Sequence, residues 1–227
     1  MASLEKNILG LFRGTIGSVV ARKFNGKQVI SVRPGAYRKS NSLKSQVERS
    51  KFSSVVNFAK YINSISVLQS IWNQSGVEGF SAYHKIIKMN LLLTTDGQLG
   101  EMNIIVPASL NSLRINYTLQ SNNIECEVLQ FQNILSENAS EQCTLQFVFA
   151  FSQSLENKNT SNKISGCSYS LSSQSLQDNP NMTFSLSCEI KRSMLQYKKC
   201  IMYSTILWRK NHDSKFYWST TCPKTLY

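Results

Sequence analysis

Leu113–Gln120 reads Leu-Arg-Ile-Asn-Tyr-Thr-Leu-Gln, so that apolar and polar side chains alternate at every step. Successive side chains of a β-strand point to opposite faces, and the alternation therefore predicts a strand with one buried face and one wet face. The same period of two predicts further strands downstream. They cover Ile124–Val128, Cys143–Phe149, Cys167–Leu171, Phe184–Ile190, Lys199–Trp208 and Phe216–Thr220.

These strands are short and are separated by polar turns, a pattern typical of antiparallel sheets packed face to face. We predict an immunoglobulin-like β-sandwich over residues 94–227, with a jelly roll as the alternative. The Cys…Trp…Cys spacing of antibody domains is absent, because Trp208 and Trp218 lie too late in the chain. The predicted fold class is α+β, mainly β.

Upstream of the turn Thr94–Gly97, apolar residues recur at helical spacing instead. Ala59 and Ile62 share a helix face in this segment, and the pattern breaks near Gly76. Residues 42–93 are therefore predicted to form two or three amphipathic helices, as a small helical subdomain.

Residues 1–41 contain a hairpin signal and are predicted to form a basic arm. Two runs rich in strand formers flank Asn25-Gly26, and both turn residues accept the positive φ that a type I′ turn needs. A lone hairpin is marginally stable, so it must pack on its own chain or pair with the sheet edge of a neighbour. The residues predicted to form this assembly hairpin are Val19, Val20, Asn25, Gly26, Val29 and Ile30.

The positive charge is concentrated near the N-terminus. Residues 1–90 hold 14 Lys/Arg and three acids, for +11, whereas the other 137 residues hold 11 basic and ten acidic side chains, for +1. Such asymmetry favours an anionic partner, nucleic acid or another polyanion, although a solvated segment or docking on an acidic subunit explains it too. The candidate polyanion-binding residues are Arg22, Lys23, Lys27, Arg33, Arg38 and Lys39.

Aromatic residues lie among these cations. Phe24 follows Arg22 and Lys23, and Tyr37 precedes Arg38. Such rings can stack on exposed bases, but Phe24 is also explained by packing within the hairpin's own face.

The sequence offers little for catalysis, so we expect no enzymatic activity and no cofactor. Neither His84 nor His212 has a second ligand at metal spacing. Glu125 and Glu127 share a strand face that we expect to be solvated. The six cysteines lack a C-x-x-C pair and fall mostly on apolar strand faces, which favours reduced, structural thiols over three disulfides.

No apolar run approaches the roughly 20 residues that a membrane helix needs, so no membrane span is predicted. The N-terminus lacks the basic start and long apolar core of a secretory signal. We therefore expect cytoplasmic synthesis, with release inside a particle as one route to the exterior.

The N-terminal segment resembles an uncharacterised bacterial family of unknown function. The resemblance covers roughly 60 residues and implies a glycine-punctuated hairpin, a basic proline-containing segment, a helix and then a strand-rich domain. It implies no activity. The matching residues are Gly10, Gly14, Gly17, Asn25-Gly26-Lys27, Arg33-Pro34, Gln46, Arg49 and Phe52.

These features favour a self-assembling structural subunit of a viral particle or a bacterial surface filament, forming a homo-oligomer or higher assembly. A nucleic-acid-binding protein that uses the basic N-terminal segment is the second hypothesis. The third is a sandwich-type carbohydrate- or protein-binding module, for which exposure of Trp208, Tyr217 or Trp218 would be a sign.

Overall fold

The protein is described from a computed structural model, which places most of the chain in two compact units, Met1–Ser42 and Leu43–Tyr227. The described residues are 2–3, 13–24, 26–33, 35, 40–95, 97–111, 114–120, 123–129, 139–154, 162–172, 181–210 and 215–227.

The first unit is a small antiparallel sheet with strand order β1-β4-β3-β2. The predicted hairpin is β3–β4, in which Phe24 lies opposite Lys27 and Gly26 has a φ of 78°. It does not stand alone, because β2 pairs with β3 and β1 pairs with β4. The strand bounds are β1 Ala2–Ser3, β2 Gly14–Ile16, β3 Val19–Phe24 and β4 Lys27–Val32.

The second unit is built around a five-stranded antiparallel sheet with strand order β11-β10-β7-β8, and β12 also pairs with β10. The pairing of β7 with β10 is the longest in this unit and runs from Tyr197 opposite Ser154 to Lys210 opposite Ala139. The strand bounds are β7 Ala139–Ser154, β8 Lys163–Ser172, β10 Tyr197–Lys210, β11 Phe216–Trp218 and β12 Cys222–Thr225.

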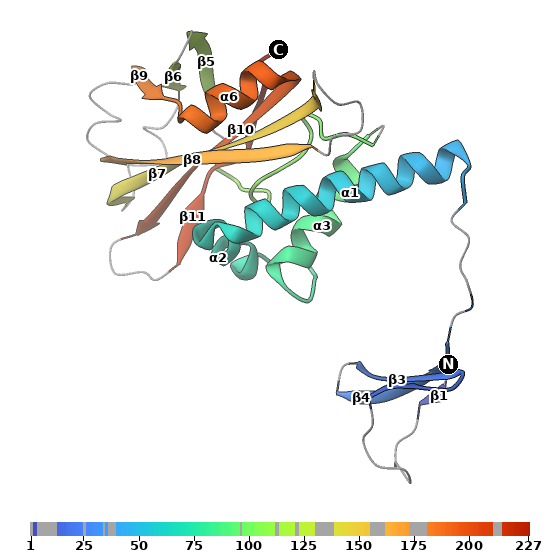
Figure 1. The fold of residues 1–227 in the computed structure, drawn as a ribbon. Coiled ribbons are helices and arrows are strands. Elements are labelled where there is room, and N and C mark those ends of the chain that lie inside the picture. Colours follow the sequence, from blue (N-terminus) through green and yellow to red (C-terminus); the bar gives the residue numbers. More distant parts are fainter. Residues whose placement is uncertain are drawn as a thin grey trace. The chain divides into compact units, whose positions relative to one another are not determined.

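Three helices cover one face of this sheet, and a second sheet with a fourth helix covers the other (Figure 1). The helices on the first face are α1 Leu43–Ser64, α2 Ser66–Gln74 and α3 Ala82–Leu93. The second sheet has the order β5-β6-β9. Its strands are β5 Arg114–Gln120, β6 Asn123–Leu129 and β9 Asn181–Ser185, and the fourth helix is α6 Cys188–Gln196.

Two hydrophobic cores follow from this layering, one on each face of the central strands. Phe147 and Met202 point toward the second sheet, whereas Val148 and Tyr203 point toward the helices, and all four side chains are fully buried. The central strands are therefore apolar on both faces, as strands covered on both sides must be.

The predicted class, α+β and mainly β, is confirmed, with antiparallel sheets and four helices among the described residues. The immunoglobulin-like sandwich is not confirmed, because helices occupy one face of the main sheet and the sheets are not closed. The helical segment shares its core with β7 and β10 and lies in the same compact unit as they do.

The strand predicted over Phe184–Ile190 is wrong in its second half. Strand β9 ends at Ser185, and Ser187 begins a helix, because its hydroxyl oxygen accepts a hydrogen bond from the Ile190 amide at 3.4 Å. Serine is a strong helix N-cap, and this capping replaces the ladder that the alternation had predicted.

None of the six cysteines, all of which lie in described segments, forms a disulfide. Burial in the core raises the pKa of Cys126 and Cys200 to about 12 and that of Cys143 to about 11. Because the thiolate is the reactive form, these side chains behave as small apolar groups.

Thiol labelling should therefore distinguish a single cysteine. Cys188 is exposed at the start of α6, so we expect it alone to react quickly with a thiol reagent at mildly alkaline pH. The three buried cysteines, Cys126, Cys143 and Cys200, should react only after denaturation, and the half-buried Cys167 and Cys222 should react more slowly than Cys188. Mass-mapped alkylation with a Cys188→Ser control measures this, and fast labelling of Cys126 or Cys200 in the native protein would contradict the buried core.

No helix within the described parts of the chain is long and apolar enough to cross a membrane.

Candidate functional site

The N-terminal sheet is the first candidate site, because it has two faces of different chemistry. Side chains directly opposite one another on antiparallel strands share a face, so the strand register assigns each residue. We call one side the apolar face. Its described side chains are Ile16, Val19, Ala21, Lys23, Gln28, Ile30 and Val32.

The apolar face is exposed at the end formed by Ile16 and Val32, whereas Ala21 and Gln28, farther along the same face, are buried. Ile16 is 66% exposed and Val32 is 76% exposed. Among the described residues of this unit, only Ala21 and Gln28 are buried. A sheet that leaves large aliphatic side chains in water gains little hydrophobic stabilisation, at roughly 25 cal/mol per Å² of buried area.

We call the opposite side the basic face. It carries Arg22 and Phe24 from β3 and Lys27 from β4, and the half-buried Val20 and Val29 lie on the same face. Phe24 is 65% exposed, so it does not pack into the hairpin, and the packing explanation for this residue is wrong. An aromatic ring exposed between two cations can stack on a planar group while the cations bind anions.

The other predicted polyanion-binding residues are distributed differently. Lys23 is exposed but belongs to the apolar face. Arg33 is exposed just after β4, where its amide donates a hydrogen bond of 2.6 Å to the Ser18 carbonyl. Arg38 and Lys39, and the hairpin residue Asn25, lie outside the described residues.

Two lysines of the basic N-terminal third have structural partners in the second unit. Lys85 is buried, and its Nζ donates hydrogen bonds to the carbonyls of Trp72 at 3.0 Å and Ser75 at 2.9 Å. It thereby caps the C-terminal end of α2, where a positive charge is favourable. Lys88 lies 3.2 Å from Glu78 in an exposed ion pair. Neither lysine is a candidate for binding an external polyanion.

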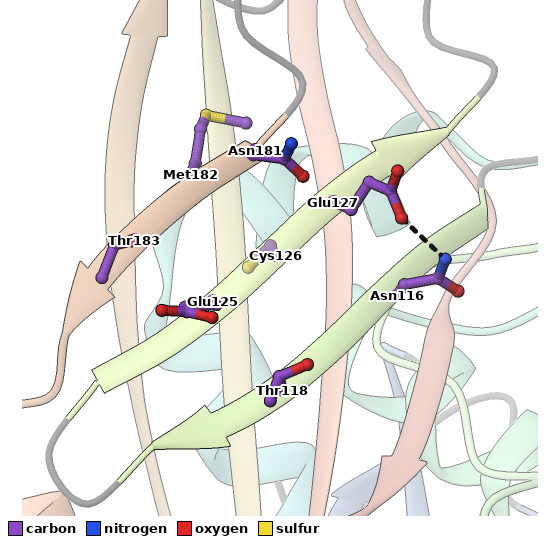
Figure 2. Close-up of a pocket in the computed structure, with 8 residues that line it drawn as sticks. All are labelled: Asn116, Thr118, Glu125, Cys126, Glu127, Asn181, Met182 and Thr183. Atoms are coloured by element: carbon purple, nitrogen blue, oxygen red, sulfur yellow. Dashed lines mark hydrogen bonds between the residues drawn. The ribbon is translucent and has the colours of Figure 1, made fainter.

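A second candidate is a hollow of about 380 Å³ on the outer face of the β5-β6-β9 sheet (Figure 2). The register places Glu127 between Asn116 and Asn181, and Glu125 between Thr118 and Thr183. Each carboxylate is thus flanked by neutral hydrogen-bonding side chains on both neighbouring strands.

The side chains that point into the hollow are polar. Asn116 Nδ2 donates a hydrogen bond of 2.9 Å to Glu127 Oε2, which orients that carboxylate. Cys126, between the two glutamates in sequence, points to the opposite side of the sheet and is buried in the core. Glu125 and Glu127 thus share the wet face that the alternation predicted. Their half-buried carboxylates give the hollow a negative charge.

A third, apolar hollow of about 370 Å³ lies beside β11 and is lined by Gln74, Lys215, Phe216, Tyr217 and Trp218. Two of its aromatic side chains contact other residues of the protein. Trp218 Nε1 donates to the Pro107 carbonyl at 3.0 Å, and Arg209 lies 4.0 Å from the centre of the Phe216 ring.

Of the aromatic residues named for a carbohydrate-binding module, Trp208 is buried. Tyr217 and Trp218 are half-buried, because they pack against the two cores while also lining the third hollow. His84 accepts or donates a hydrogen bond with Ser81 at 2.9 Å, and His212 lies outside the described residues. The described side chains contain no group of three or more His, Cys, Asp or Glu residues arranged to hold a metal.

No protein-family model, curated protein or solved structure gives a significant match to this chain. The resemblance of the N-terminal 60 residues to an uncharacterised bacterial family stays a prediction. The two faces of the N-terminal sheet, and the hollow of Figure 2, are therefore interpreted from their own chemistry.

Proposed function

We propose that this protein is a non-enzymatic structural subunit that assembles through the apolar face of its N-terminal sheet. The single observation that carries the proposal is the exposure of Ile16 and Val32, which both lie beside Val19 at one end of the apolar face. Exposed apolar patches on small elements mark interaction sites, and a few strands need packing to be stable.

A second copy of the same face is the partner that fits best. The first 42 residues hold eight Lys/Arg against one acid, so two copies repel each other unless their charges point apart. On the apolar face, the charged side chain among the described residues is Lys23, and it lies at the far end of β3 from Val19. Two such faces can bury Ile16 and Val32 against each other while Arg22 and Lys27 stay in water.

The larger assembly that we propose is a viral particle or a bacterial surface filament. The second unit supplies a rigid body with two cores, whereas the first supplies the contact. Assembly through a self-complementary patch produces closed dimers, and further contacts between second units would extend them.

Placing a charge on the apolar face should dissociate the oligomer. We expect Ile16→Lys to shift the protein from oligomer to monomer in sedimentation velocity, because an unpaired ammonium would be buried in the contact. Negative-stain microscopy of the same samples should show loss of regular particles or filaments.

Thr15→Lys is the matched control, since it adds the same charge one residue away on the opposite face. It should leave the oligomer intact. A wild-type protein that is monomeric at all concentrations, or equal dissociation by Ile16→Lys and Thr15→Lys, would overturn the proposal.

A further inference from the structure

We propose that the basic face of the N-terminal sheet binds single-stranded nucleic acid, with Phe24 stacking on a base and with Arg22 and Lys27 contacting phosphates. This inference goes beyond assembly and does not depend on it, because the two activities use opposite faces of the sheet.

The register places the three side chains together. Phe24 and Lys27 are directly opposite each other, and Arg22 lies two residues before Phe24 on the same strand and the same face. Side chains two residues apart on a strand are about 7 Å apart, and directly opposite side chains are closer still. All three are exposed, so a ligand reaches them without any rearrangement of the sheet.

The surrounding charge supports an anionic ligand. The described residues of this unit carry Arg13, Arg22, Lys23, Lys27 and Arg33 and no acidic side chain. A polyanion is therefore attracted over the whole unit, and its affinity should fall steeply with salt as counterions are released.

The exposed ring distinguishes nucleic acid from other polyanions. Charge alone would attract an acidic protein or a sulfated glycan, and neither needs an aromatic side chain in water. A base offers a flat π-face to Phe24, and such stacking occurs with every base, so it requires no particular nucleotide sequence. In a duplex both faces of each base are already stacked, so single strands are the favoured form.

Binding is measured with the full-length protein and a fluorescently labelled oligothymidylate, by anisotropy between about 50 and 200 mM salt. We expect Phe24→Leu to weaken binding roughly tenfold, since a lost base–aromatic stack has an effect of this order. Phe24→Tyr keeps a stacking ring and should bind nearly as well as the wild type, which separates stacking from any disturbance of the hairpin.

Lys23→Ala is the matched control for Arg22→Ala. Both remove one positive charge from neighbouring positions, but Lys23 points to the apolar face. Arg22→Ala should reduce the slope of log affinity against log salt by about 0.7, the value of one phosphate contact on a single strand, whereas Lys23→Ala should leave the slope unchanged.

Three results would overturn the inference. They are equal loss of binding in Arg22→Ala and Lys23→Ala, no loss in Phe24→Leu, and competition by duplex DNA or heparin as strong as that by single strands. Ile16→Lys should still bind the oligonucleotide, so a failure of assembly and a failure of binding are seen separately.

Discussion

Replacing Gly166 with alanine is expected to lower the free energy of unfolding of the second unit by about 3 kcal/mol. Gly166 lies on β8 opposite Val148, at the point where α1 crosses the sheet. A Cβ atom there would lie 2.5 Å from the Phe147 carbonyl oxygen and 2.8 Å from the Tyr61 hydroxyl. The carbonyl belongs to the sheet and cannot move without disturbing the pairing of β7 with β8.

Urea denaturation followed by tryptophan fluorescence measures this effect, because all three tryptophans lie in the second unit. Gly76→Ala is the control, since an added Cβ there meets open space. That substitution should be neutral or should stabilise the protein by about 0.4–1 kcal/mol, through reduced freedom of the unfolded chain. Equal effects at the two glycines would show that α1 does not lie against β8 as described.

Replacing Trp72 with alanine is expected to cost about 3–5 kcal/mol, the usual range for a large aromatic side chain removed from a core. Trp72 is fully buried in the core between the helices and the main sheet. Its Nε1 donates a hydrogen bond of 2.9 Å to the Ile105 carbonyl, and its own carbonyl accepts from Lys85. It therefore joins α2, the segment after α3 and the sheet.

Two further variants test whether the loss of stability comes from the buried position of Trp72. In the Trp72 variants, Trp208 and Trp218 remain as fluorescent reporters. Trp72→Phe keeps most of the buried ring but leaves the Ile105 carbonyl without its donor, so a cost of about 1–3 kcal/mol is expected. Phe80→Ala removes an aromatic side chain that is 83% exposed and should change stability by less than about 0.5 kcal/mol. A Trp72→Ala cost as small as that of Phe80→Ala would contradict the helical layer.

The basic face of the N-terminal sheet illustrates which features of a binding site can be predicted from sequence. The cluster Arg22, Lys23, Phe24 and Lys27 is visible as a basic segment with an aromatic residue inside it. The sequence left open whether Phe24 packs or is exposed, because that depends on whether anything covers the face. The strand register then separates Lys23 from Arg22 and Lys27, which adjacency in the chain does not reveal.

Lys85 illustrates the opposite case. It was counted with the basic N-terminal third, yet it is buried and caps α2 through the carbonyls of Trp72 and Ser75. The turn after α2 brings α3 back beside that helix end, and no local pattern encodes this approach. A lysine is normally exposed, so composition alone assigns it to the surface.

The sequence by itself determined most of the local structure of this protein, the exception being the second half of the strand predicted over Phe184–Ile190, where α6 begins instead. Periods of two and 3.6 place strands after Gly97 and helices before Thr94, and Asn25-Gly26 places the hairpin turn, because these signals depend on neighbouring residues alone. Only the tertiary structure decided that the helices form a layer on the main sheet and which cations face water. Periodicity predicts which face of a helix or strand is buried. Which other element covers that face depends on contacts between residues far apart in the chain.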